Sequence, residues 1–175
     1  MTVTDVPSPA VTELGVGRPV LVLGAAPGSP GLAALAARFK VFAVADDASS
    51  AAWVGAQGFE AVGVVGVGEA ASVALALVRE LGETADALVL VSPAGLEIGE
   101  GERPAAPVCV LIGDRDAAAA PLAHWRRALH ASTVVVFDAG ADILADRPDA
   151  FASAAGDFLD RKARFAFAES MALSR

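Results

Sequence analysis

Short, continuous apolar runs alternate with stretches of helical periodicity along most of this chain. Apolar runs that are bounded by glycine, proline or acidic residues are typical of strands buried on both faces of a parallel sheet. Six runs are predicted as such strands: Pro19–Leu23, Val41–Ala45, Ala61–Val65, Ala87–Val91, Val108–Ile112 and Val134–Phe137. Residues 11–14 add at most one short edge strand.

Apolar residues spaced three and four positions apart predict helices between these strands. The first helix has Ser29 as its N-cap, Pro30 at its first position and Phe39 on its apolar face. The other predicted helices run from about Glu69 to Leu81, from near Pro121, and from Pro148. Residues 46–59 are predicted to form a short connection with about one helical turn, and residues 93–106 a solvated loop. The alternation predicts an α/β fold of three layers with about six mostly parallel strands.

The length of 175 residues fits one folded domain. Residues 1–17 predict a loose N-terminal arm, residues 18–161 the α/β domain, and residues 162–175 a helical extension or tail. The tail carries apolar residues that suggest a surface for self-association: Phe165, Phe167, Met171 and Leu173. We therefore expect a possible homo-oligomer.

Composition limits the partners of this protein. The formal charge of −8 argues against nucleic acid, because binding to a phosphate backbone needs clustered Lys and Arg. No uninterrupted apolar run reaches the length of about 18 residues that a membrane helix needs. A single cysteine, Cys109, is compatible with a reducing compartment. We expect a cytoplasmic protein that binds neither nucleic acid nor membrane.

Three separated motifs resemble those of the α/β-hydrolase fold family. Gly66-Val67-Gly68-Glu69-Ala70 is similar to the nucleophile elbow G-x-S-x-G, with Gly68 in the place of the nucleophile. Gly113-Asp114-Arg115-Asp116 resembles the turn that supplies the catalytic acid, which would be Asp116. The loop from Gly140 to Pro148 resembles the loop that carries the catalytic histidine, whose place is taken by Ala141. The resemblance runs from about Pro19 to Arg161.

The resemblance implies a minimal α/β-hydrolase-like fold with a degenerate triad at Gly68, Asp116 and Ala141. The helical cap that many members insert would be missing, because only residues 93–106 lie at its place. The family's oxyanion hole would correspond to the backbone N–H groups of Ala25 and Glu69. Such a chain is not a standard serine hydrolase.

Carboxylates form a second candidate site. Parallel α/β sheets gather their sites at the carboxyl ends of the strands. The residues expected at this rim are Asp46, Glu69, Ser92, Asp116 and Asp142. Several carboxylates in one cleft could perform general acid/base chemistry or hold a cation. The alternative is that Asp116 and Asp142 cap loops and helix ends, and that the others are solvated.

Other features have simpler interpretations. Gly66, Gly68 and Ala71 also match a dinucleotide-binding fingerprint, but the next strand ends in Ser92-Pro93 and offers no acidic residue for a ribose. His124 and His130 lie six positions apart on one predicted helix, so they cannot share a metal and are expected at the surface. Cys109 lies within a strand and is expected to act as a small hydrophobe. We expect no cofactor and no metal site.

Two functional hypotheses remain open. The first is a non-catalytic protein that binds a small apolar molecule in the remnant cleft, or a protein partner. The second is an enzyme with non-hydrolytic chemistry, such as a lyase, isomerase or cyclase, or a weak hydrolase. In that case Glu69 and Asp116 would be catalytic, together with the oxyanion-hole amides.

Overall fold

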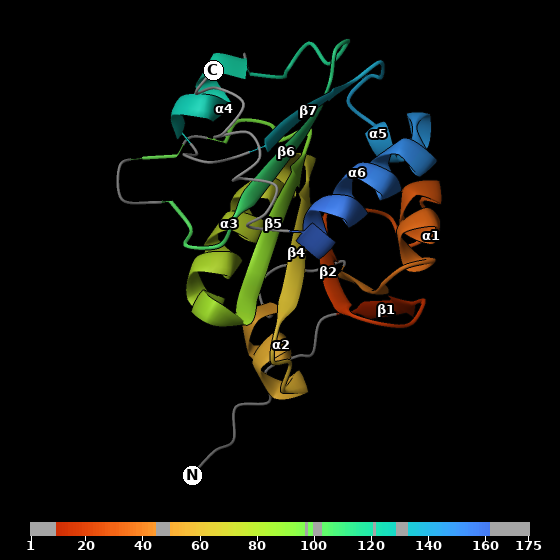
Figure 1. Cartoon of the computed structure of the whole chain (residues 1–175), viewed down its shortest axis with the longest axis vertical. Helices are drawn as coiled ribbons and strands as arrows, with labels where there is room; N and C mark the ends of the chain where they lie inside the picture. The colour runs from red at the N-terminus through yellow and green to blue at the C-terminus, as the bar shows by residue number, and fades with distance from the viewer. Residues whose placement is uncertain are drawn as a thin grey trace.

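The computed structural model of the chain describes residues 10–44, 50–96, 98–99, 103–120, 122–128 and 133–161 (Figure 1). In these residues a seven-stranded sheet has the order β1-β3-β2-β4-β5-β6-β7. The strands are β1 Val11–Leu14, β2 Pro19–Leu23, β3 Lys40–Val44, β4 Val62–Val67, β5 Ala85–Val91, β6 Val108–Gly113 and β7 Thr133–Phe137. All neighbouring strands are parallel except β1, which pairs antiparallel with β3.

The helices cover both faces of the sheet, which gives the three predicted layers (Figure 1). The α-helices are α1 Pro30–Ala36, α2 Ser50–Gln57, α3 Ala71–Leu81, α4 Leu122–Ala128, α5 Ile143–Asp146 and α6 Pro148–Arg161. Two short 3-10 helices are η1 Gly68–Ala70 and η2 Gly82–Thr84. Helices α1, α5 and α6 pack on one face, and α2, α3 and α4 on the other. The predicted fold class is confirmed.

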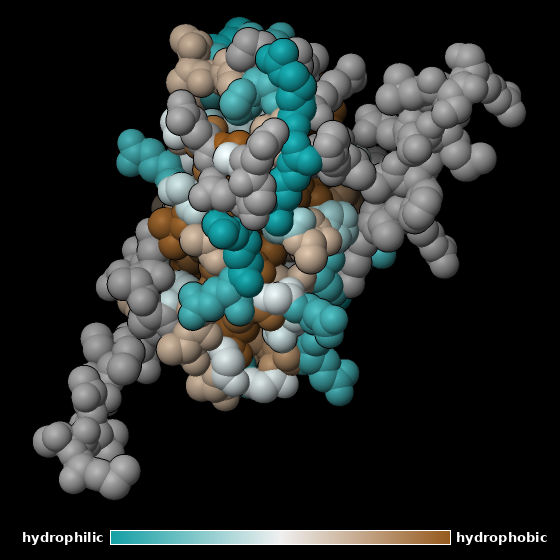
Figure 2. Space-filling model, turned by 90° about the vertical axis from the view of Figure 1, so that its left-hand side faces the viewer, coloured by the Kyte–Doolittle hydropathy of each residue, from teal (hydrophilic) through white to brown (hydrophobic). Residues whose placement is uncertain are grey.

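Alternate side chains of the central strands supply the two cores. In β2, Leu21 and Leu23 face the core under α3, whereas Val20 and Val22 face the core under α1 and α6. Burial on both faces explains why these strands are continuous apolar runs. On the side that carries α3 and α4, Figure 2 shows polar side chains outermost and hydrophobic residues recessed among them.

Several elements differ from the sequence predictions. Helix α2 is eight residues long instead of about one turn, and it packs on the sheet through the buried Ser50 and Val54. Helix α5 lies in the segment expected to be a loop after the last strand. The α-helical part of the elbow segment begins at Ala71, because residues 68–70 form the 3-10 turn η1. Phe39 lies beyond the end of α1, yet it is buried as expected.

The expected cap at Ser29 is only half correct. Ser29 occupies the N-cap position of α1, but its side chain makes no capping hydrogen bond. Its backbone carbonyl accepts from the N–H groups of Leu32 and Ala33 at 3.1 and 3.2 Å. Pro30 at the start of the helix needs no N–H partner, which reduces the need for a side-chain cap.

Two further sequence predictions concern the cap insertion between β5 and β6 and membrane-spanning helices. Between β5 and β6 those residues contain no helix or strand, so no cap domain covers the carboxyl ends of the strands. No described helix combines the length and the hydropathy required to cross a membrane. Asp46, His130 and the tail 162–175 with its apolar residues lie outside the described residues.

Candidate functional site

A cleft of about 370 Å³ lies at the carboxyl ends of β2, β4, β5 and β6. Its walls come from the loops after these strands and from the segment that leads into α5. It contains seven of the residues predicted from sequence: Ala25, Gly68, Glu69, Ser92, Asp116, Ala141 and Asp142. The remaining lining residues are Gly24, Ala26, Ser29, Val67, Ala94, Ala118 and Leu144. The structure thus brings together all the predicted site residues that it describes.

The turn after β4 is a sharp strand-to-helix turn whose tip residue, Gly68, has no side chain. Strand β4 ends at Val67, Gly68 has a φ of +58°, and η1 leads into α3. A Cβ atom built on Gly68 would meet no heavy atom within 4 Å. A side chain at this position would therefore extend into open space beside the cleft. The positive φ, and not lack of room, is what favours glycine here.

Small residues allow this turn to lie close to the neighbouring segments. A Cβ on Gly66 would lie 2.5 Å from the Cβ of Ala74, so glycine lets α3 approach β4 closely. A Cβ on Gly24 would lie 2.6 Å from both the Cβ of Ala70 and the carbonyl oxygen of Val67. The loop after β2 therefore contacts the elbow directly. This contact joins the two segments that carry the predicted oxyanion-hole amides of Ala25 and Glu69.

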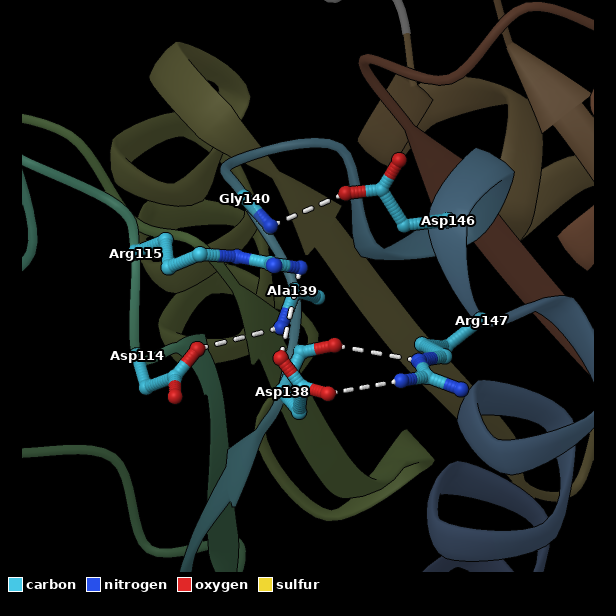
Figure 3. Close-up of polar contacts among 7 residues, drawn as sticks. All are labelled: Asp114, Arg115, Asp138, Ala139, Gly140, Asp146 and Arg147. Carbon is cyan, nitrogen blue, oxygen red and sulfur yellow. Dashed lines mark hydrogen bonds and ion pairs between the residues drawn. The ribbon is translucent and has the colours of Figure 1, made fainter.

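The turn after β6, which carries Asp116, is bound to the loop after β7 (Figure 3). The N–H of Asp114 donates to the carbonyl of Phe137 at 2.8 Å, and the N–H of Arg115 donates to that of Ala139 at 3.0 Å. In return, the Asp114 carboxylate accepts from the N–H of Ala139 at 3.2 Å. A Cβ on Gly113 would lie 2.1 Å from the carbonyl oxygen of Gly140. Only glycine allows this approach.

Acidic side chains fix the loop that contains Ala141 (Figure 3). The Asp146 carboxylate accepts from the N–H of Gly140 at 2.9 Å, and the Asp142 carboxylate accepts from the N–H of Ala145 at 3.1 Å. Arg147 donates to the carboxylate of Asp138 at 2.9 Å and to its carbonyl at 3.0 Å. The loop is therefore held at both ends, and Ala141 within it contributes only a methyl group.

The carboxylates at the cleft also have structural tasks. Asp116 is half-buried, and its Oδ1 accepts from the N–H of Ala118 at 3.0 Å. Asp142 is exposed and is the N-cap of α5, whereas Glu69 is exposed in the first turn after the elbow. Among the residues that the structure describes, no Lys, Arg or His lines the cleft and three acidic residues do, which gives this lining a negative formal charge. The described residues contain no group of three or more His, Cys, Asp or Glu that could hold a metal ion.

Ser92 has two features that sequence reasoning missed. It is the one non-glycine residue of the described segments with a positive φ, at +42°. The residue is only 6% exposed, and its hydroxyl has no hydrogen-bond partner among the described residues. The Ser92-Pro93 pair marks the end of a strand, but no local pattern in the sequence indicates a left-handed conformation.

The remaining candidates lie away from the cleft. Cys109 is buried in β6, as expected for a small hydrophobe. His124 is half-buried instead of lying at the surface, because its ring packs edge-on against Trp125 with centroids 4.8 Å apart. Neither residue can take part in chemistry at the cleft.

No protein-family model matches the chain, and neither does any curated relative. Solved structures match the fold well. An α/β hydrolase from the metagenome of sediments of the lagoon of Mar Chica, Morocco, aligns with a TM-score of 0.69 at 16% identity, over 86% of this chain and 94% of that one. The enol-lactonase from Burkholderia xenovorans LB400 aligns with a TM-score of 0.68 at 15% identity, over 86% and 95%. Carboxylesterase CesB (YbfK) from Bacillus subtilis gives 0.69 at 13% identity, over 85% and 86%.

Proposed function

We propose that this protein, which has an α/β-hydrolase fold, is catalytically degenerate and binds a small apolar molecule in the cleft. One observation carries the proposal. The elbow tip and the histidine position both line an open cleft, and they are occupied by Gly68 and Ala141. The scaffold of the site is present, and its reactive groups are not.

Serine hydrolysis needs a nucleophile, a base that accepts its proton, and an acid that orients the base. Gly68 has no side chain, and the methyl group of Ala141 cannot accept a proton. Asp116 remains, but it has no imidazole to orient. The oxyanion-hole amides of Ala25 and Glu69 alone would polarise a carbonyl without attacking it.

The cleft supports binding by its size and its lining. A volume of about 370 Å³ lies within the range of small-molecule sites, roughly 300–1,000 Å³. Apart from the acidic residues and two serines, the lining is glycine, alanine and a few larger aliphatic side chains. Burial of an apolar ligand against these groups contributes roughly 25 cal/mol per Å² of apolar surface.

Filling the cleft tests the proposal. The probe is benzyl alcohol at millimolar concentration. Its binding is measured by the changes in the backbone amide chemical shifts of the cleft residues and in the melting temperature. We expect wild type to bind it and Gly68→Leu to lose the binding, because the leucine side chain would occupy the open space at the elbow. Gly68→Ala is the matched control, since it has the same strained φ but adds only one methyl group. Equal binding by Gly68→Leu and wild type, or no binding of the probe at the cleft, would contradict the proposal.

A second candidate function is an enzyme with non-hydrolytic chemistry. The observation that favours it is that Glu69, Asp116 and Asp142 share the cleft with the elbow amides. Carboxylates near polarising N–H groups suit proton abstraction beside a carbonyl. This function predicts that a molecule bound in the cleft is chemically altered over time, and that Glu69→Gln or Asp116→Asn stops the change but not the binding. Ligand that is recovered unaltered from wild type argues against it.

Association with a protein partner or with a second copy of the chain stays a prediction from the apolar residues of the segment 162–175.

A further inference from the structure

Ser92 combines two features that cost the fold free energy. Its φ of +42° lies in the left-handed region, which non-glycine residues rarely adopt. Its hydroxyl is buried without a partner among the described residues, and such a group has lost its water without gaining a hydrogen bond. Glycine at this position would avoid both costs. Costs of this kind concentrate at functional sites.

The backbone around Ser92 is held firmly. The N–H of Ser92 donates to the carbonyl of Leu111 at 2.8 Å, which fixes the end of β5 against β6. Two residues later, the N–H of Ala94 donates to the carbonyl of Gly68 at 3.3 Å, which joins this turn to the elbow. The surrounding structure therefore imposes the left-handed conformation, and it places Ser92 on the wall of the cleft next to the elbow tip.

The charge of the residues that line the cleft limits the chemical class of its ligand. Three of the lining residues are acidic, and none of the described residues that line the cleft is basic. An anionic ligand would be repelled, and a cation would be attracted.

We propose that Ser92 is the hydrogen-bonding residue of the cleft and that the ligand is a small organic cation, an ammonium group on an apolar body. The Ser92 hydroxyl, whose oxygen is closed to solvent in the free protein, turns about χ1 toward the cleft and accepts a hydrogen bond from the ammonium N–H, and thereby gains the partner that it lacks among the described residues. The rim carboxylates of Glu69, Asp116 and Asp142 supply the counter-charge, and the apolar lining covers the rest of the molecule. This inference rests on the proposed binding function and specifies its ligand class.

Three probes of similar size test the charge preference: benzylammonium, benzyl alcohol and benzoate. Each probe is titrated while the backbone amide chemical shifts of the cleft residues are monitored. We expect the cleft to bind benzylammonium with the highest affinity and benzoate with the lowest. Binding of benzoate as tight as that of benzylammonium would overturn the inference. Since benzyl alcohol reports the apolar cleft itself, its binding separates this failure from failure of the proposed function.

Two substitutions test Ser92. Ser92→Ala and Ser92→Gly should weaken benzylammonium binding by roughly tenfold or more, the loss expected for a hydrogen bond to a charged group. Ser153→Ala is the matched control, because Ser153 is exposed on α6 and does not line the cleft. It should bind benzylammonium as wild type does.

The same variants separate a binding role from a structural one. Ser92→Gly removes both the strained φ and the unpartnered hydroxyl, so its melting temperature without ligand should rise while its affinity falls. A purely structural serine would give the opposite pair of results, with lower stability and unchanged affinity. If Ser92→Gly binds benzylammonium as tightly as wild type while Gly68→Leu still abolishes binding of benzyl alcohol, the role of Ser92 is wrong and the cleft is right.

Discussion

At the residue scale, two glycines of the loop after β2 differ in their backbone conformation and in the space around their Cβ positions. Gly24 has a φ of +79°, and a Cβ there would clash at 2.6 Å with Ala70 and Val67. Gly28 has open space around it and no positive φ. The lack of a side chain at Gly24 allows the loop that contains Ala25 to contact the elbow. At Gly28 no close contact requires glycine.

Gly24→Ala should therefore lower the free energy of unfolding by about 2 kcal/mol or more, because backbone strain and a steric clash add together. Gly28→Ala should change it by less than about 0.5 kcal/mol, or raise it slightly by restricting the unfolded chain. Urea denaturation of both variants measures the difference. Equal effects of the two substitutions would mean that the loop and the elbow are not in close contact.

The residues of the cleft could be found from sequence to different degrees. Gly68, Asp116 and Ala141 each lie in a short motif whose spacing is local, so the residues alone indicate their positions. The strain and burial of Ser92 arise from hydrogen bonds to Leu111 and between Ala94 and Gly68. These are tertiary contacts, and no sequence window contains them. The open space that a side chain at Gly68 would meet likewise depends on the tertiary structure and cannot be inferred from sequence.

At the element scale, Arg38 joins the end of α1 to α6. Its guanidinium donates to Asp160 at 2.6 Å and to Asp157 at 3.0 Å. Hydrogen bonds to Asp160 and then to Asp157 raise the pKa of the Arg38 guanidinium above its ordinary value. The Arg38 side chain is 39% exposed, so solvent screens the pairs.

Arg38→Ala should cost about 0.5–1 kcal/mol of unfolding free energy at low salt and less at high salt, since exposed ion pairs contribute little and are screened. Arg38→Lys, which keeps the charge but not the fork of donors, should lose part of this amount. A raised pKa gives stability that is fully present below the pKa of the unfolded chain's arginine and is lost only as the pH rises through the folded pKa, far above neutral pH. Urea titrations at neutral and mildly alkaline pH should therefore show the same difference between wild type and variant. A difference that changes over this range would show that another group is involved.

Elements with strong periodicity or long apolar runs could be predicted from sequence, and short ones could not. The central strands and α3 and α6 are encoded by their own hydrophobic patterns. Apart from Trp53, helix α2 is built mainly of small residues with little amphipathic contrast, and it packs on the sheet through Val54 and through Trp53, whose ring contacts Phe42. Helix α5 is a single turn that is capped by Asp142 and lies against α1, where Gly31 approaches Leu144.

At the scale of the whole molecule, the cleft exists because parallel strands end at one edge of the sheet. The loops after β2, β4, β5 and β6 meet there, and the loop after β7 is bound to the turn after β6. In the described residues no cap domain covers this edge. The arrangement follows from topology and does not depend on which side chains stand at the triad positions. An α/β-hydrolase fold can therefore support different functions through the residues at this edge.

Adding a nucleophile and a base to the cleft provides a positive control for the proposed degeneracy. Gly68→Ser together with Ala141→His supplies these two groups in the cleft that Asp116 also lines. The double variant should hydrolyse p-nitrophenyl butyrate at least about tenfold faster than either single variant, because the two groups act as a unit.

The most direct test of the central claim is the rate of p-nitrophenyl butyrate hydrolysis by the purified wild-type protein, measured beside Asp116→Ala. We predict that both rates equal the uncatalysed background, because Gly68 supplies no nucleophile at the elbow tip and Ala141 supplies no imidazole base. Hydrolysis by wild type well above that background, and its loss in Asp116→Ala, would contradict the claim that this cleft binds without hydrolysing.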